Sequence, residues 1–153
     1  MAARLQQEAM AFIHSRNTLQ LASITETGEP FASYAPFAIG DGVFYVLLSE
    51  LAIHGKNLQH HAQVSILIVE DEGDADEVFA RVRVQFSAVA QLIPRDTPAW
   101  QTGIQALAQR HGDRIHQLRQ LPDFKLFQLQ PNTLRFVKGF GRACELSGET
   151  LIQ

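Results

Sequence analysis

The sequence predicts a mainly β domain in which six or seven short antiparallel strands curl into a small barrel, with helices at its periphery. Short apolar runs alternate with tight-turn sequences such as ETGEP and GDG, and strands joined in this way pair antiparallel. Closing the sheet into a barrel would remove its exposed edges. Helical patterns occur at the chain start, between the third and fourth strands, and before the last two strands.

The first part of the chain predicts one helix and three strands. Residues 4–16 place apolar side chains on one helical face. The runs at 18–25, 31–39 and 43–48 are predicted strands. Pro36 removes a backbone donor, so the second strand is expected at a sheet edge or with a bulge. The third strand is apolar on both faces, which indicates an interior position.

The later elements follow a similar pattern, interrupted by an acidic run. The strand at 63–70 is apolar on both sides and is predicted to be interior. Residues 70–77 are acidic but lack the glycine position of an EF-hand, so they predict a solvated loop. Residues 79–90 alternate, so one face is core and the other is wet or lines a pocket or interface. The next element expected is a helix at 95–112, which begins with a capping residue and has Pro98 in its first turn. A short helical piece around Ile115 and Leu118 and strands at 124–130 and 133–140 follow.

Composition indicates one globular domain over residues 1–153. Hydrophobic residues make up 46% and charged residues 19%, which is ordinary for a protein with a buried core. The net charge of −3 argues against nucleic acid or an anionic membrane as partner. We find no apolar run near the roughly 20 residues of a membrane span, and no secretory signal pattern. Cys144 is the single cysteine and cannot form an internal disulfide, so a cytoplasmic location is expected.

The stretch SELAIHGKNLQHHAQ, residues 49–63, separates two strongly apolar runs. If a helix begins at Ser49, then Ala52, Lys56 and His60 share its face. A helix N-terminus with a hydroxyl and a lysine on one face can bind a phosphate or a carboxylate. The alternative is that Ser49 merely caps the helix and Lys56 is solvated.

Other chemical signals in the sequence are weak. His54, His60 and His61 lack the spacing and cysteine partners of a helical zinc site. The sequence also lacks a Gly-rich phosphate loop, a G-x-S-x-G elbow and an H-E-x-x-H motif. Asp123 is a lone acid at a strand start, where capping or solvation is its ordinary role. The residues alone therefore leave the chemistry open.

Four segments, taken in order, resemble one known family. They read TLQLASITETGEPFASYAPF, HGKNLQHHAQVSILIVEDE, FARVRVQFSAVA followed by IPRD, and DFKLFQLQPNTLRFVKGFGRA. From about residue 5 to residue 149 the chain is similar to the HugZ/HutZ-type haem-utilisation proteins of the pyridoxamine-phosphate-oxidase-like, FMN-binding split-barrel superfamily. The resemblance implies a six-stranded antiparallel split barrel that forms a homodimer, with ligand pockets along the subunit interface.

The resemblance also implies roles for particular residues. In FMN-binding members, a serine or threonine at a strand end and a basic residue about seven positions later hold the flavin phosphate, and in this chain the matching pair is Ser49 and Lys56. The positions implied to bind a cofactor are Ser49, His54, Lys56, Asn57 and Arg83. Asp123 matches an acid near the penultimate strand and is the expected catalytic residue.

Haem or FMN is therefore the expected cofactor, and three functions stay open. They are haem binding with oxidative opening of the macrocycle for iron acquisition, an FMN-dependent oxidoreductase, and a non-enzymatic carrier of haem or flavin. Haem-binding members carry an iron-ligating histidine in an additional C-terminal segment, typically in an H-x-x-x-GH context. The last histidine of this chain is His116, so the iron ligand is unassigned: the chain is a short member, ligates haem differently, or does not use haem.

Overall fold

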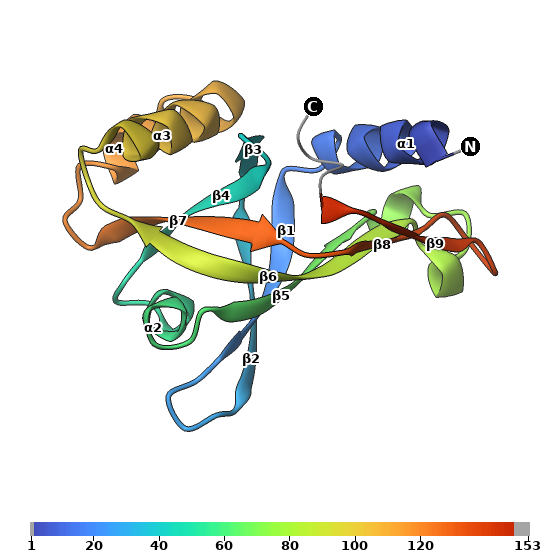
Figure 1. Cartoon of the computed structure of the whole chain (residues 1–153), viewed down its shortest axis with the longest axis horizontal. Helices are drawn as coiled ribbons and strands as arrows, with labels where there is room; N and C mark the ends of the chain where they lie inside the picture. Colours follow the sequence, from blue (N-terminus) through green and yellow to red (C-terminus); the bar gives the residue numbers. More distant parts are fainter. Residues whose placement is uncertain (1, 149–153) are drawn as a thin grey trace.

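The computed structural model describes residues 2–148 as one antiparallel sheet curled into a half-barrel, with helices around it (Figure 1). The strands are β1 (Thr18–Ile24), β2 (Pro30–Pro36), β3 (Ala38–Gly40), β4 (Val43–Ser49), β5 (Gln63–Val69), β6 (Arg83–Ile93), β7 (Phe124–Pro131), β8 (Leu134–Val137) and β9 (Ala143–Leu146). The helices are α1 (Ala2–His14), α2 (Ile53–His60), α3 (Pro98–His111) and α4 (Arg114–Leu118), and the 3₁₀ turns are η1 (Glu72–Asp74) and η2 (Val78–Ala80). Among these helices we find none with the length and apolarity needed to cross a bilayer.

The described strands follow the order β2-β1-β5-β6-β7-β4-β3, with β8 paired to β6 and β9. All of these pairings are antiparallel, as the tight turns predict. The sheet has nine strands rather than six or seven. The predicted strand at 31–39 divides at Phe37 into β2 and β3, which pair with different neighbours. The chain beyond Val137 also turns back as β9, which the sequence pattern did not indicate.

The edge position predicted from Pro36 is confirmed, because β2 ends the strand order and pairs with β1. This strand contributes little to the core: Ala35 is buried, whereas Tyr34 is 65% exposed. In Figure 1 the hairpin of β1 and β2 projects away from the rest of the sheet. The hairpin therefore carries surface that the described part of the chain leaves uncovered.

Two apolar clusters form the core. The larger one joins α1 to the inner side of the curled sheet, where Phe44 lies 5.5 Å from Phe37 and 4.9 Å from Phe86 between ring centroids. The smaller one lies under α3 and includes Trp100 and Tyr45. The capped start predicted for α3 is confirmed, because the Thr97 side chain accepts a hydrogen bond from the Trp100 amide.

The interior position predicted for β5 is confirmed, although only one of its faces is fully buried. The strand lies inside the sheet, between β1 and β6, but Val64, Ile66 and Ile68 point inward while Gln63 and Ser65 are exposed. No described helix packs against that second face, so its side chains meet solvent. The sheet thus keeps a large outer surface free.

The helix predicted to begin at Ser49 begins at Ile53, so that prediction was wrong. Ser49 instead ends β4, because its backbone pairs opposite Phe124 of β7. The first turn of α2 then packs closely on this strand end. A Cβ atom on Gly55 would lie 2.1 Å from the Ser49 carbonyl oxygen, so only glycine fits there.

We expect Gly55→Ala to destabilise the fold by about 2 kcal/mol, because the added methyl group must push α2 away from β4. Urea unfolding measures the free energy difference. Gly73→Ala is the matched control, since nothing lies within 4 Å of a Cβ at that position. Equal stability of the two variants would contradict the close contact between α2 and Ser49.

Candidate functional site

A hydrogen bond joins Ser49, at the end of β4, to Asp123, at the start of β7. Ser49 Oγ donates to Asp123 Oδ2 at 2.7 Å and accepts from the Leu51 amide at 3.1 Å. The Glu50 amide donates to the backbone carbonyl of Asp123 at 2.7 Å. Both side chains of the pair are half-buried. Asp123 Oδ1 has no hydrogen-bond partner within residues 2–148, so the pair presents one free carboxylate oxygen.

Lys56 and Ser49 do not share a helical face, because Ser49 lies outside α2. Lys56 is exposed, and its ammonium group makes no ion pair or hydrogen bond with the described residues. His60, one turn later, is also exposed. Binding of one anion by both Ser49 and Lys56 therefore stays a prediction.

His54, in the first turn of α2, contacts the edge strand β2. Its Nδ1 lies 3.1 Å from Ser33 Oγ, and the Ser33 hydroxyl donates to the Leu21 carbonyl. His54 Nδ1 therefore shares a hydrogen bond with Ser33, while Nε2 has no hydrogen-bond partner among the described residues. Burial lowers the pKa of His54 below its ordinary 6.5, so the ring is neutral at pH 7. A neutral imidazole of this kind can accept a proton or coordinate a metal ion.

Asn57 points into the protein. It is buried, and its Nδ2 donates to the Ser23 hydroxyl, also buried, at 3.0 Å. A pair of buried polar groups that satisfy one another fixes the packing of α2 on β1. A cofactor contact by Asn57 remains a prediction, and its structural contact is with Ser23.

Arg83 lies at the far end of the sheet from Ser49 and Asp123. It begins β6, opposite Val137 of β8, whereas Ile93 at the other end of β6 pairs with β7 close to Asp123. The 11 residues of β6 place its two ends as much as about 33 Å apart. Arg83 is therefore separated along β6 from Ser49 and Asp123, which lie beyond its other end, and Figure 1 shows the length of β6 between β8 and the start of β7.

The outer sheet face, formed by the exposed side of β1, β5 and β6, is almost free of charge. Its central row is Ala22, Ser65 and Ser87, and the next row is Gln20, Leu67 and Gln85. Two hollows, of about 500 and 360 Å³, lie on this surface. Arg83 shares this face by strand alternation. A flat surface with few charges is typical of contacts between protein chains.

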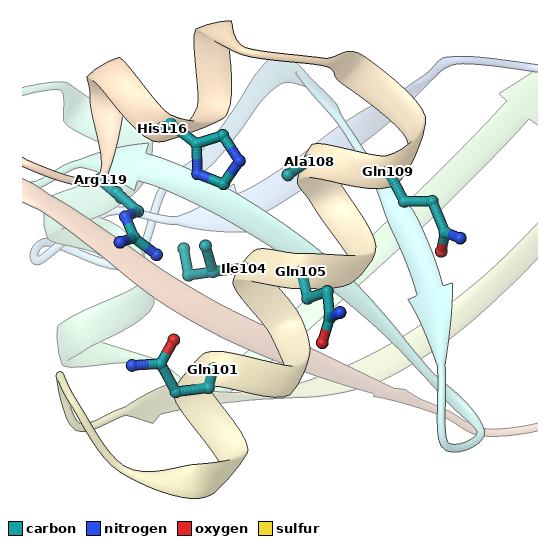
Figure 2. A pocket seen from close by; sticks show the side chains of 7 residues that line it. All are labelled: Gln101, Ile104, Gln105, Ala108, Gln109, His116 and Arg119. Carbon is teal, nitrogen blue, oxygen red and sulfur yellow. The ribbon is translucent and has the colours of Figure 1, made fainter.

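Another hollow, of about 490 Å³, lies between α3 and α4. Figure 2 shows the polar side chains of Gln101, Gln105 and Gln109 along α3, with His116 and Arg119 pointing toward them. None of these residues contacts Ser49 or Asp123. Within the described residues, no group of three or more His, Cys, Asp or Glu side chains is arranged to hold a metal ion.

Ser33 is the residue of this site that the sequence patterns missed. It lies half-buried in an edge strand and contacts His54 across 21 positions of the sequence. Local periodicity carries no information on such a contact. The SYAPF segment that contains Ser33 was part of the family resemblance, and it was the signal that could have identified the residue.

The depressed pKa of His54 predicts a pH-dependent stability. The unfolded chain binds the His54 proton near pH 6.5, whereas the folded chain binds it only at lower pH, so the contribution of His54 to stability falls as pH drops below 6.5. We expect the stability difference between the wild type and His54→Gln to shrink from pH 7.5 to pH 5 in urea unfolding. His116→Gln, at an exposed position, corrects for the loss of an imidazole. A difference that stays constant or grows would contradict the burial of His54.

Comparison with known proteins agrees with this fold. The family model of pyridoxamine 5'-phosphate oxidase matches residues 5–138. "Heme oxygenase HutZ" of Vibrio cholerae serotype O1 is 45% identical over 149 residues, which are 97% of this chain and 85% of that protein. The crystal structure of HutZ, described there as a heme storage protein, superposes with a TM-score of 0.83 at 46% identity, covering 88% of this chain and 95% of HutZ.

Two further crystal structures match at lower identity. Campylobacter jejuni ChuZ has a TM-score of 0.87 at 28% identity and covers 97% of this chain, which spans 61% of ChuZ. A heme-binding protein from Mycobacterium smegmatis has a TM-score of 0.83 at 28% identity and covers 96% of this chain, which spans 59% of that protein. The chain therefore belongs to the pyridoxamine 5'-phosphate oxidase family, within its HugZ/HutZ-type group of haem-utilisation proteins.

Proposed function

We propose that the chain binds haem at a site formed by two copies and supports oxidative opening of the macrocycle for iron acquisition. The observation that favours haem over FMN as the ligand is the hydrogen bond from the Ser49 hydroxyl to the Asp123 carboxylate. The relatives support the proposal, since they are described as a heme oxygenase, a heme storage protein and a heme-binding protein.

The Ser49–Asp123 pair does not fit a flavin phosphate. The hydroxyl proton that a phosphate would need is donated to Asp123, and the hydroxyl oxygen accepts from the Leu51 amide. A phosphate beside Ser49 would also lie close to the Asp123 carboxylate. Two such charges about 4 Å apart repel by about 4 kcal/mol near a protein surface. Of the two residues predicted to bind the phosphate, Lys56 is positively charged and would offset part of this repulsion. FMN is therefore the second candidate.

The same residues suit haem. Haem iron commonly takes a neutral imidazole, and the His54 ring is neutral, with an Nε2 that has no partner among the described residues. Haem propionates are carboxylates, which pair well with a guanidinium such as that of Arg83. The free oxygen of Asp123 can accept a hydrogen bond from a ligand or a water molecule. Leu51 and Ile53, 71% and 53% exposed, supply apolar surface beside Ser49 for the ring.

Two copies are needed because the predicted residues lie at opposite ends of β6. A single ligand cannot contact Arg83 and Asp123 of one chain if the two are about 30 Å apart. The second copy is also the occupant that the uncharged outer sheet face suits, since interface centres are depleted of charge. The projecting β2, with Tyr34 exposed, supplies further surface for a partner. We therefore infer a homodimer that brings the two ends together.

Bound haem would supply the redox chemistry, namely oxygen activation with electrons from an external donor. The chain itself would bind the ring beside Leu51 and Ile53 and hold the Asp123 carboxylate in place through Ser49. Haem storage without turnover is the alternative, because the Vibrio relative is described both as an oxygenase and as a storage protein.

A haem titration followed by absorption spectroscopy tests the proposal. We expect a sharp Soret band that saturates near one haem per chain, and no saturable binding when FMN replaces haem. Adding ascorbate in air to the haem complex should then bleach the Soret band and release iron to a chelator.

Two results would contradict the proposal, and each points to a different function. Saturable FMN binding that Ser49→Ala and Lys56→Ala both weaken, with broad non-saturating haem absorption, would move the protein to flavin chemistry. A saturating Soret band that ascorbate and air leave intact would instead make it a haem-holding protein without turnover.

A further inference from the structure

The guanidinium of Arg95 joins the start of α3 to the segment at residues 119–124, which is far away in the sequence. Arg95 follows the end of β6 and leads into α3. Its Nη1 donates to the Arg119 carbonyl at 2.6 Å, and its Nη2 donates to the carbonyls of Leu121 and Phe124 at 3.1 and 3.3 Å. Its Cζ also lies 5.5 Å from the ring centroid of the buried Trp100. One side chain thus holds three carbonyls of the segment between α4 and β7.

Asp123 lies within that segment. One side of the segment is held by Arg95, and the other side is held by β4, through the Ser49 hydroxyl and the Glu50 amide. Without Arg95, this segment would lose its bonds to the loop between β6 and α3, and it would keep its contacts with β4 and its own backbone hydrogen bonds, such as that from the Phe124 amide to the Leu121 carbonyl. The carboxylate of Asp123 would then lose one of the two restraints on its position.

The geometry requires arginine at this position. Three acceptors on one side chain need the planar fork of a guanidinium, and stacking over Trp100 keeps that fork in place. A lysine at residue 95 would keep the charge but could not reach the three carbonyls in one arrangement. Asp96, the next residue, has a left-handed φ of 65°, so the loop adopts an unfavourable backbone conformation in placing this side chain.

We propose that Arg95 is a positioning residue that holds Asp123 in place for the haem site. This inference rests on the proposed haem-binding function for its role, but the restraint itself is a property of the chain without ligand. Arg95 acts through Asp123 and not by contact with the ligand.

Amide hydrogen exchange on the chain without haem tests the restraint. We expect exchange at the Glu50 amide, which donates to the Asp123 carbonyl, to speed up about tenfold in Arg95→Ala, with a smaller change in Arg95→Lys. Arg119→Ala is the matched control, because the Arg119 guanidinium also lies over Trp100, at 5.6 Å, but bonds none of these carbonyls. Unchanged exchange in Arg95→Ala, or an equal change in Arg119→Ala, would overturn the proposal.

A double-mutant cycle on haem binding tests whether Arg95 acts through Asp123. Arg95→Ala should weaken haem binding about tenfold and shift the Soret band in the same direction as Asp123→Asn, and the double variant should bind no more weakly than Asp123→Asn alone. Losses that add would show that Arg95 acts independently of Asp123, against the proposal. If the wild type fails to bind haem, the proposed function fails, while the exchange experiment still decides whether Arg95 restrains the segment.

Discussion

The hydrogen bond from the Ser49 hydroxyl to the Asp123 carboxylate is the contact on which the site depends. It forms because β4 and β7 pair in a register that places Ser49 opposite Phe124, so the preceding residue arrives beside the end of β4. A slip of one residue would turn the side chains of β4 to the opposite face. Buried side chains on both strands, Phe44 and Phe127 among them, oppose such a slip. The core thus determines where the Asp123 carboxylate lies.

The length of β6 imposes the second constraint. It keeps Arg83 and Asp123 at opposite ends of one sheet, so a ligand that uses both residues needs two chains. The outer sheet face between those ends has uncharged side chains such as Ala22, Ser65 and Ser87, and the cores of protein interfaces are depleted of charge. In the proposed dimer, the half-barrel would separate Arg83 from Asp123 within each chain, and pairing of two copies would bring them together.

The local sequence predicted those features of the fold that depend only on neighbouring residues in the chain. The alternation in β6, the edge position from Pro36 and the capped start of α3 are of this kind. The start of α2 was not predictable, because pairing of Ser49 with Phe124 overrides its helix-capping preference.

Local sequence patterns could not predict the contacts of the site, because the contacting residues are far apart in the sequence. Ser49 and Asp123 are 74 positions apart, and His54 and Ser33 are 21 apart. The interior position of β5 was predictable from its apolar residues, whereas the exposure of Gln63 and Ser65 on its outer face depends on what packs there, which local sequence does not show. The family resemblance pointed to individual residues of the site, and the structure supplied their partners.

The most direct test of the two-copy site is complementation between two defective variants. Arg83→Ala and Asp123→Asn should each bind haem weakly alone. Unfolded together and refolded, they should regain saturable binding at about a quarter of the sites, because random pairing gives mixed dimers with one intact Arg83–Asp123 combination. Binding no stronger than the average of the two separate variants would contradict a site shared between copies.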